Sequence, residues 1–186
     1  RIKNLEFNYN KSSYILKELE NKYLIQLFNF FQNFSKKEKN YFGYPLFVPI
    51  NLTLKEFKTK YHLYLSEKNK WIYHLLFHKK KIIGLYYIKK IGFKNIKGNS
   101  KRSPTFGGPF VIKKYRRNRL GFLLTKICFY QAKLLKIKKL YSTVVFSNKA
   151  SFKLSSKAGW KKTGRINLLE NGALETEFCK TQNPSR

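Results

Sequence analysis

The stretch from Phe110 to Trp160 constrains the fold more than any other part of the chain. It begins with a short apolar run at 110–112 and continues with a basic segment that ends at Gly121. Apolar residues then recur at the spacing of one helix face, at positions 120, 123, 124, 127, 128, 134 and 135. A β-branched run at 143–145 predicts a second strand, and a shorter helix follows that stops at Gly159. The predicted order is therefore strand, basic loop, helix, strand, helix.

The basic segment at 113–119 predicts an anion site at the start of the longer helix. The first N–H groups of a helix have no intrahelical acceptor, and the helix dipole places partial positive charge there. A pyrophosphate fits such a position. Arg116, Arg117 and Arg119 add charge-assisted donors around it. A solvated run of charge has the same composition, so the loop alone leaves both interpretations open.

Two motifs carry a resemblance to a known family. The first motif is the loop Arg/Gln-x-x-Gly-x-Gly/Ala, which follows a strand. The six residues at the corresponding place in this chain are Arg116-Arg117-Asn118-Arg119-Leu120-Gly121. The segment from Asn148 to Trp160 contains Ser151, Lys157 and Gly159, in the pattern Asn-x-x-Ala/Ser-(x)5-Lys-x-Gly-aromatic. With a helix and a strand between them, these motifs resemble the acetyl-CoA-binding core of the GNAT N-acetyltransferase superfamily.

The resemblance implies an α/β (α+β) fold. We expect a mixed, mostly antiparallel twisted sheet of six to seven strands, with about four helices and a splayed central strand. The expected division of the chain is a loose N-terminal arm or edge strand at 1–12, one acetyltransferase domain at 13–180 and a tail at 181–186. The glycine pair at 107–108 predicts a bulge or a close approach to the backbone.

The resemblance also implies which residues bind acetyl-CoA. The backbone of Phe110 and Val111 would pair with the pantetheine arm as an added strand does, and a backbone N–H near Val111 would stabilise the oxyanion. The Asn148 side chain would bond the same arm, or act as a plain N-cap, or do both. The full set of expected cofactor-binding residues is Phe110, Val111, Arg116, Arg117, Asn118, Arg119, Leu120, Gly121, Asn148 and Lys157.

The chain departs from the family pattern at two positions. Arg119 occupies the place of the first loop glycine. An arginine is unfavourable at that position if the backbone there is left-handed. Ser155 occupies the place of a tyrosine that often protonates the leaving thiolate. Ser155 is therefore the candidate catalytic residue, donating through water, against the alternative of a serine on the helix surface.

A general base is harder to place, because no carboxylate occurs between Glu67 and Glu170. The remaining candidates are His74, Glu177, Glu18, Glu20 or a chain of water molecules. The positive field of the protein would itself lower the pKa of an acceptor amine, so a dedicated base is not required.

Charge is the most unusual property of the composition. The 186 residues contain 40 lysines and arginines against 9 acidic residues, all glutamates, for a formal net charge of +31. An AT-rich genome favours lysine but does not remove acidic residues, so a partner that carries negative charge is expected as well. RNA, the ribosome and an anionic substrate are the candidate partners.

Other residue types exclude several classes of protein. Cys128 and Cys179 have no metal-ligand spacing and are expected to be buried thiols in a reducing compartment, and no metal site is expected. No apolar run reaches the length that spans a bilayer. The sequence begins with Arg1 and contains no methionine, which is compatible with the removal of an N-terminal leader. The expected location is the cytoplasm, or an organelle matrix if a leader was removed.

Flanking segments predict further elements. A strand at 14–19 and a helix at 21–34 lead to a loop at 41–50 and to a second helix from Thr53 to Tyr64, with Glu56 completing a capping box. Strands at 71–77 and 82–91 would form a hairpin, and a basic loop follows at 94–103. A second hairpin is expected at 161–169 and 173–180.

The function that this sequence favours is an N-acetyltransferase that moves the acetyl group of acetyl-CoA to a primary amine. The acceptor could be a protein N-terminus, a lysine or a small amine. The alternative is a GNAT-fold protein without catalysis, kept as a structural or RNA-contacting subunit of a ribonucleoprotein such as a ribosome.

Overall fold

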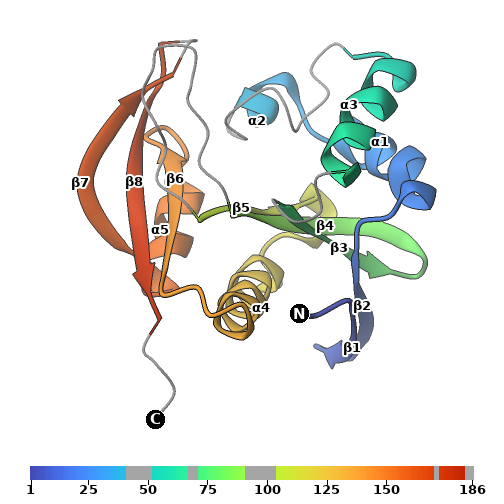
Figure 1. Cartoon of the computed structure of the whole chain (residues 1–186), viewed down its shortest axis with the longest axis horizontal. Helices are drawn as coiled ribbons and strands as arrows, with labels where there is room; N and C mark the ends of the chain where they lie inside the picture. Colours follow the sequence, from blue (N-terminus) through green and yellow to red (C-terminus); the bar gives the residue numbers. More distant parts are fainter. Residues whose placement is uncertain (41–51, 67–70, 91–103, 170–171, 183–186) are drawn as a thin grey trace.

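A computed structural model describes residues 1–40, 52–66, 71–90, 104–169 and 172–182 (Figure 1). Eight strands form one sheet in the order β1-β2-β3-β4-β5-β6-β8-β7. Their bounds are β1 Asn4–Tyr9, β2 Ser12–Glu18, β3 Trp71–His78, β4 Lys81–Lys89, β5 Thr105–Val111, β6 Lys139–Val145, β7 Lys161–Leu168 and β8 Leu174–Thr181. All neighbours are antiparallel except β5 and β6, so the expected mixed and mostly antiparallel sheet is confirmed with one or two more strands than predicted.

Helices cover both faces of the sheet (Figure 1). α1 (Leu24–Gln32) and α3 (Leu54–Ser66) pack on one face, where they bury a cluster rich in phenylalanine and tyrosine. α4 (Leu120–Leu134) and α5 (Lys149–Lys157) lie on the other face, against the second apolar cluster. Alternate residues of each central strand contribute to the two clusters, as the period of two requires.

The central strand of the sheet separates from its neighbour. β5 and β6 are parallel and share one pair, Thr105 with Tyr141, supported by a bond from Tyr141 N–H to Pro104 O of 2.9 Å. Beyond that pair the two strands diverge (Figure 1). The splay that the sequence predicted is therefore present, and residues 107–110 in the middle of the sheet stay half-exposed.

A bulge bends β5 where the glycine pair was expected to matter. The register with β4 shifts between the pairs Tyr87–Gly107 and Leu85–Phe110. Gly108 lies inside the bulge at φ +104°, a conformation that glycine alone adopts readily.

The N-terminal segment forms the edge strand that was one of its two expected states. Residues 1–12 contain β1, which pairs along its whole length with β2 and forms one edge of the sheet. A short helix that the sequence did not predict, α2 (Lys36–Asn40), follows α1. Ser35 and Glu38 form a capping box there, with Glu38 N–H donating to Ser35 Oγ and Ser35 N–H donating to Glu38 Oε2.

Several other sequence predictions can be compared directly. The Thr53–Glu56 capping box is present, with Thr53 N–H 2.7 Å from Glu56 Oε2. Both predicted hairpins are present as β3–β4 and β7–β8. The loops expected at 41–50 and 94–103 lie outside the described residues. The tail expected from 181 begins inside β8, and 183–186 lie outside the described residues.

None of the helices in the described part of the chain combines the length and the apolar character that crossing a membrane requires. Cys128 is fully buried, as expected, whereas Cys179 is only half-buried.

Candidate functional site

The candidate site is the open edge of β5 beside the start of α4. A 3₁₀ turn at Lys113–Tyr115 and the basic residues 116–119 connect the two elements. The first hydrogen bond of α4 runs from Leu123 N–H to Arg119 O, at 3.0 Å. The N–H groups of Leu120, Gly121 and Phe122 therefore have no acceptor within the helix, and no acidic residue occupies the first turn. The free first turn that the sequence predicted is therefore present, and its binding of an anion stays a prediction.

The loop reaches this geometry through left-handed residues. Arg117 has φ +66°, and Arg119, the N-cap of α4, has φ +58° and ψ +7°. Arg119 therefore adopts the conformation that the sequence argument considered unfavourable for it, at a cost of about 1 kcal/mol. The left-handed backbone also explains why the family motif has glycine at this position. Both arginine side chains are exposed, as is Asn118 between them.

Gly121 lies where three elements meet. A Cβ on Gly121 would be 3.4 Å from Pro109 Cγ of β5 and 3.6 Å from Leu154 Cδ2 of α5. Those are ordinary van der Waals distances, so a methyl group fits at this position. This agrees with a motif that accepts glycine or alanine.

Arg116 makes contacts that the sequence did not predict. Its Nε donates to Val111 O at 2.8 Å, its Nη1 bonds Glu38 Oε1 of α2, and its guanidinium lies 5.6 Å from the centre of the Phe34 ring. Its backbone N–H donates to Lys113 O. Arg116 thus ties α2 to the end of β5 through two of its five side-chain N–H donors.

At the open edge of β5, the C=O and the N–H of Val111 differ in whether they already have a hydrogen-bond partner. Ile112 N–H donates to Ile83 O of β4 at 3.0 Å, so Val111 C=O, on the same planar peptide unit, points away from β4. Arg116 already occupies that carbonyl. In a strand, the N–H and C=O of one residue point to the same side, so Val111 N–H also lies on the open edge.

The second motif forms α5, and its residues divide between two faces. Asn148 is the N-cap, with its Oδ1 accepting from Ser151 N–H at 3.1 Å, so the N-cap role is confirmed. Ser155 is 9% exposed and lies on the inner face of α5 with Ala158, which shows that it is not a surface serine. Lys157 is exposed.

The four side-chain candidates for a general base occupy different places. His74 is buried on the α4 face, where its Nε2 lies 2.9 Å from Ile2 O, and burial lowers its pKa to about 4. Glu18 pairs with Arg1. Glu20 pairs with Lys22 at 2.8 Å. Glu177 is 1% exposed on β8 and accepts a bond of 2.9 Å from Thr163 Oγ1 of β7.

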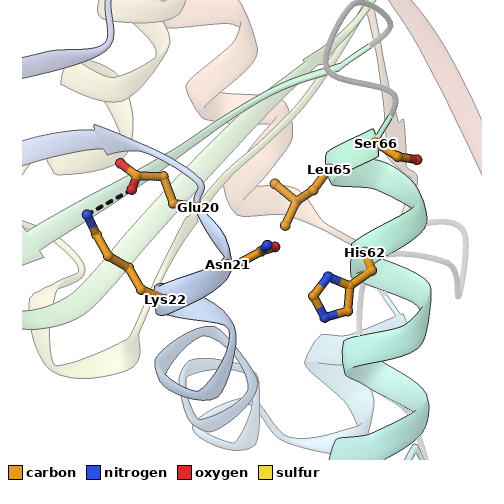
Figure 2. Close-up of a pocket in the computed structure, with 6 residues that line it drawn as sticks. All are labelled: Glu20, Asn21, Lys22, His62, Leu65 and Ser66. Carbon is orange, nitrogen blue, oxygen red and sulfur yellow. Dashed lines mark ion pairs between the residues drawn. The ribbon is translucent and has the colours of Figure 1, made fainter.

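Glu20 lines a pocket of about 520 Å³ between the end of β2 and α3 (Figure 2). The other lining residues are Asn21, Lys22, His62, Leu65 and Ser66. The Glu20 carboxylate points toward Lys22 and away from His62 (Figure 2), so its charge is balanced locally. The pocket lies between the 3₁₀ turn at Asn21–Tyr23 and the C-terminal half of α3.

Two buried carboxylates lie together on β8, and the sequence analysis considered only one of them. Glu177 pairs with Thr143 of β6 and Glu175 with Val145, and Asn167 Nδ2 donates to Glu175 Oε1 at 3.3 Å. Phe178, the residue after Glu177, belongs to the cluster under α4 and α5, so the two glutamates face the opposite side of the sheet. A spacing of two in the segment Glu175-Thr176-Glu177 was the available sequence signal.

The fold agrees with that of known acetyltransferases. An acetyltransferase of the GNAT family from Streptococcus pneumoniae matches with a TM-score of 0.65 and 20% identity, covering 91% of this chain and 99% of that one. RimL, a ribosomal L7/L12 alpha-N-protein acetyltransferase in complex with coenzyme A, matches with a TM-score of 0.73 and 11% identity. The match covers 97% of this chain and 100% of that one. A ribosomal-protein-S5-alanine acetyltransferase from Vibrio fischeri matches with a TM-score of 0.70 and 16% identity, over 95% of this chain and 96% of that one.

Comparison of the sequence alone finds no matching family model and no matching curated protein. The likeness is therefore one of structure, over nearly the whole length of each protein. Together with the splayed β5 and the free first turn of α4, it establishes that this chain has the fold of the GNAT acetyltransferase superfamily.

Proposed function

We propose that this protein is an N-acetyltransferase that uses acetyl-CoA and acetylates a primary amine. The observation that carries the proposal is the gap between β5 and β6 next to the free N–H groups of α4. An extended arm with a pyrophosphate at one end fits an open strand edge that leads to a helix N-terminus. Acetyl-CoA has that form, and it would supply the acetyl group as a thioester.

In this proposal the backbone holds most of the cofactor. The N–H groups of residues 120–122 take the pyrophosphate, with the exposed side chains of Arg117 and Arg119 beside it. Val111 N–H is the donor for the oxyanion, because Val111 C=O is occupied by Arg116. The Asn148 Nδ2 group is the side-chain donor to the arm, since only its Oδ1 is used by the cap.

We further propose that Glu177 receives the proton that the attacking amine loses. Among the candidates, its support is the best: it is buried, it lies on the strand next to β6, and it faces the side of the sheet that carries α1 and α3. When the C–N bond forms and the C–S bond breaks, the thiolate needs a proton. That proton comes from water, and Ser155, which is buried on the inner face of α5, is the proposed hydrogen-bond donor that relays it and regains its own proton from the same water.

The acceptor preference rests on charge. A surface of net +31 favours amines carried by acidic or nucleic-acid-associated partners, such as the N-terminus of a ribosomal protein. Two of the similar structures are named as acetyltransferases of ribosomal proteins, but at 11% and 16% identity the likeness covers the fold alone.

Thermal unfolding with and without 1 mM acetyl-CoA tests the proposal. A ligand at a hundredfold excess over its Kd stabilises the folded state by about 2.7 kcal/mol, which raises Tm by about 5–10 °C in a protein of this size. R117E/R119E should abolish the shift. The matched control, K161E/K162E, reverses two exposed charges on β7 and should keep it. Absence of any shift would exclude acetyl-CoA as the ligand.

A binder then needs an activity test. Thiol release from acetyl-CoA, measured with a panel of peptide N-termini, lysine peptides and polyamines, should depend on the amine and fall at least tenfold in E177Q. A protein that binds acetyl-CoA and acetylates none of them would fit the alternative of a GNAT-fold subunit without catalysis. Arg119 in a glycine position and the high charge favour that alternative.

A further inference from the structure

The outer face of α4 carries a strip of exposed lysines around one exposed aromatic ring. We define the α4 strip as Lys126, Tyr130, Lys133, Lys136 and Lys138. Residues 126, 130 and 133 are spaced as i, i+4 and i+7, which places them on one side of the helix. Residues 136 and 138 extend the strip past the C-terminal end of α4. All five are exposed.

The lysines of the strip have no acidic counterpart. The described residues contain no ion pair to any of the four, and the sequence has no carboxylate between Glu67 and Glu170. The nearest acidic residues along the chain that are described, Glu175 and Glu177, are buried. The four lysines therefore carry positive charge that no ion pair among the described residues balances, and such charge attracts a polyanion.

Tyr130 distinguishes the strip from an ordinary solvated helix face. Its side chain is 58% exposed, the largest exposed fraction among the exposed large hydrophobic residues of the described chain. Along the helix, Tyr130 lies four residues after Lys126 and three before Lys133, and the Lys126 ammonium lies 5.3 Å from the centre of the Phe122 ring. An exposed aromatic ring between cations offers a surface on which an unstacked nucleic-acid base can lie while the lysines contact the phosphates on either side.

The backbone at the end of α4 keeps the strip continuous. Lys136 occupies the left-handed position after the helix, at φ +56°, where glycine is usual. Ile137 N–H bonds back to Ala132 O at 2.9 Å and closes the helix end. The chain then turns into β6 with Lys138 exposed, so the cations run without interruption from the helix to the sheet.

We propose that the α4 strip binds single-stranded nucleic acid, with the phosphates on the lysines and one base on Tyr130. Seven residues of helix separate Lys126 from Lys133, a rise of about 10 Å, so the strip covers only a few nucleotides. It is a different region of α4 from the first-turn amides of the candidate acetyl-CoA site. Binding at the strip therefore does not depend on the proposed enzymatic function.

The test is fluorescence anisotropy of the full chain with 5′-labelled eight-nucleotide oligouridylate, over a range of salt concentrations. Four phosphate contacts predict a slope of about −3 in log K against log salt. K133Q/K136N/K138Q should reduce the magnitude of that slope by about two. Y130L should weaken binding about tenfold with the slope unchanged. Equal Tm values for the variants and the parent establish that they fold.

A matched control removes three lysines from the opposite face of the sheet. K55Q/K58Q/K60Q in α3 lowers the net charge by the same amount and should keep the affinity within about twofold. If it weakens binding as much as the strip variant, total charge explains the affinity and the proposal fails. It also fails if Y130L has no effect and polyglutamate competes as well as RNA, because the partner is then an acidic protein.

Deoxyuridylate of the same length separates the two sources of this chemistry. Equal affinity assigns binding to phosphates and bases, which RNA and single-stranded DNA share. Tighter binding of the RNA assigns an additional contact to the 2′-hydroxyl. Both results support the strip. Acetyl-CoA at 1 mM should not compete with either oligonucleotide, and competition would place the nucleic acid at the cofactor site instead.

Discussion

The ring of Tyr87 lies directly over Gly107, so that a Cβ built on Gly107 would stand 1.9 Å from Tyr87 Cζ and 2.3 Å from its hydroxyl. The two residues are paired across β4 and β5, immediately before the bulge at Gly108. Tyr87 also stacks on Tyr73 of β3, with ring centres 5.2 Å apart. A row of rings thus reaches across the sheet to the open edge of β5, and glycine is what allows it.

G107A should destabilise the fold by about 3 kcal/mol, because the methyl group cannot coexist with the Tyr87 ring. Y87L/G107A should lose less stability than the sum of the two single variants, since leucine vacates the space over residue 107. Urea unfolding of the four proteins measures this coupling. Additive losses would show that the ring does not occupy this position.

R119G should raise the stability of the protein. Glycine adopts the left-handed conformation of residue 119 without the steric cost that an arginine side chain incurs, and the net gain after its larger unfolded-state entropy is about 0.5–1 kcal/mol. The expected rise in Tm is about 2–3 °C. R119A removes the same charge without relieving the strain and should give no rise. A rise in both variants would attribute the effect to charge instead.

Glu38 should make the protein less stable in acid. Partial burial raises the pKa of Glu38, but the Ser35 N–H bond and Arg116 outweigh burial, so the pKa lies below the ordinary 4.5. Stability from this group is complete above the unfolded-state pKa and is lost as pH falls through the lower folded-state pKa. E38Q should remove that dependence and cost about 1 kcal/mol or less at neutral pH, since Arg116 is partly exposed.

His74 should make the free energy of unfolding depend on pH in a higher range than Glu38 does. Its carbonyl partner Ile2 O can only accept, so neutral His74 carries its proton on Nε2, and Nδ1 is buried without a partner among the described residues. Burial lowers the pKa of His74 to about 4, against an ordinary 6.5. Between these values the unfolded chain binds more protons, so stability is complete above pH 6.5 and falls by about 3 kcal/mol toward pH 4.

H74Q should flatten the pH dependence between 6.5 and 4, because glutamine can donate to Ile2 O but does not titrate. Unfolding free energies measured by urea at five pH values across that range give the slope. H62Q, which removes an exposed histidine of α3, is the control and should keep the parent slope. An unchanged slope in H74Q would show that His74 is not the source.

Substitutions of Asn148 separate its two roles. N148A should lose about 1 kcal/mol of stability because the bond from Ser151 N–H is lost, whereas N148S should keep the cap. Both variants lack the Nδ2 donor, so both should lose the same part of the Tm shift with acetyl-CoA. A full shift in N148S would restrict Asn148 to the cap.

The sequence predicted the parts of the site that local backbone chemistry determines. The free first turn of α4, the cap at Asn148 and the bulge at Gly108 each follow from residues that are close together in the chain. The resemblance added the splay between β5 and β6. Their roles toward a ligand stay predictions.

What the sequence missed depends on contacts between distant residues. The bond of Arg116 to Glu38 joins residues 78 positions apart, and no local pattern indicates that this arginine serves α2. The burial of Ser155 depends on which face of α5 meets the sheet. The left-handed conformation of Arg119 is unfavourable for a residue with a side chain by about 1 kcal/mol, and Arg119 adopts it nonetheless as the N-cap of α4.

The single pair between Thr105 and Tyr141 has a consequence for folding. From β1 to β5 the order in space is the order along the chain, and β6, β7 and β8 form a second group that follows α4 in the chain and pairs with the first at Thr105 and Tyr141. Each group contains its own short-range hairpin, which closes quickly, and their docking is the long-range step. The gap between β5 and β6 is then the boundary between two cooperative units. It should be the last feature to assemble and the first whose amides exchange with solvent.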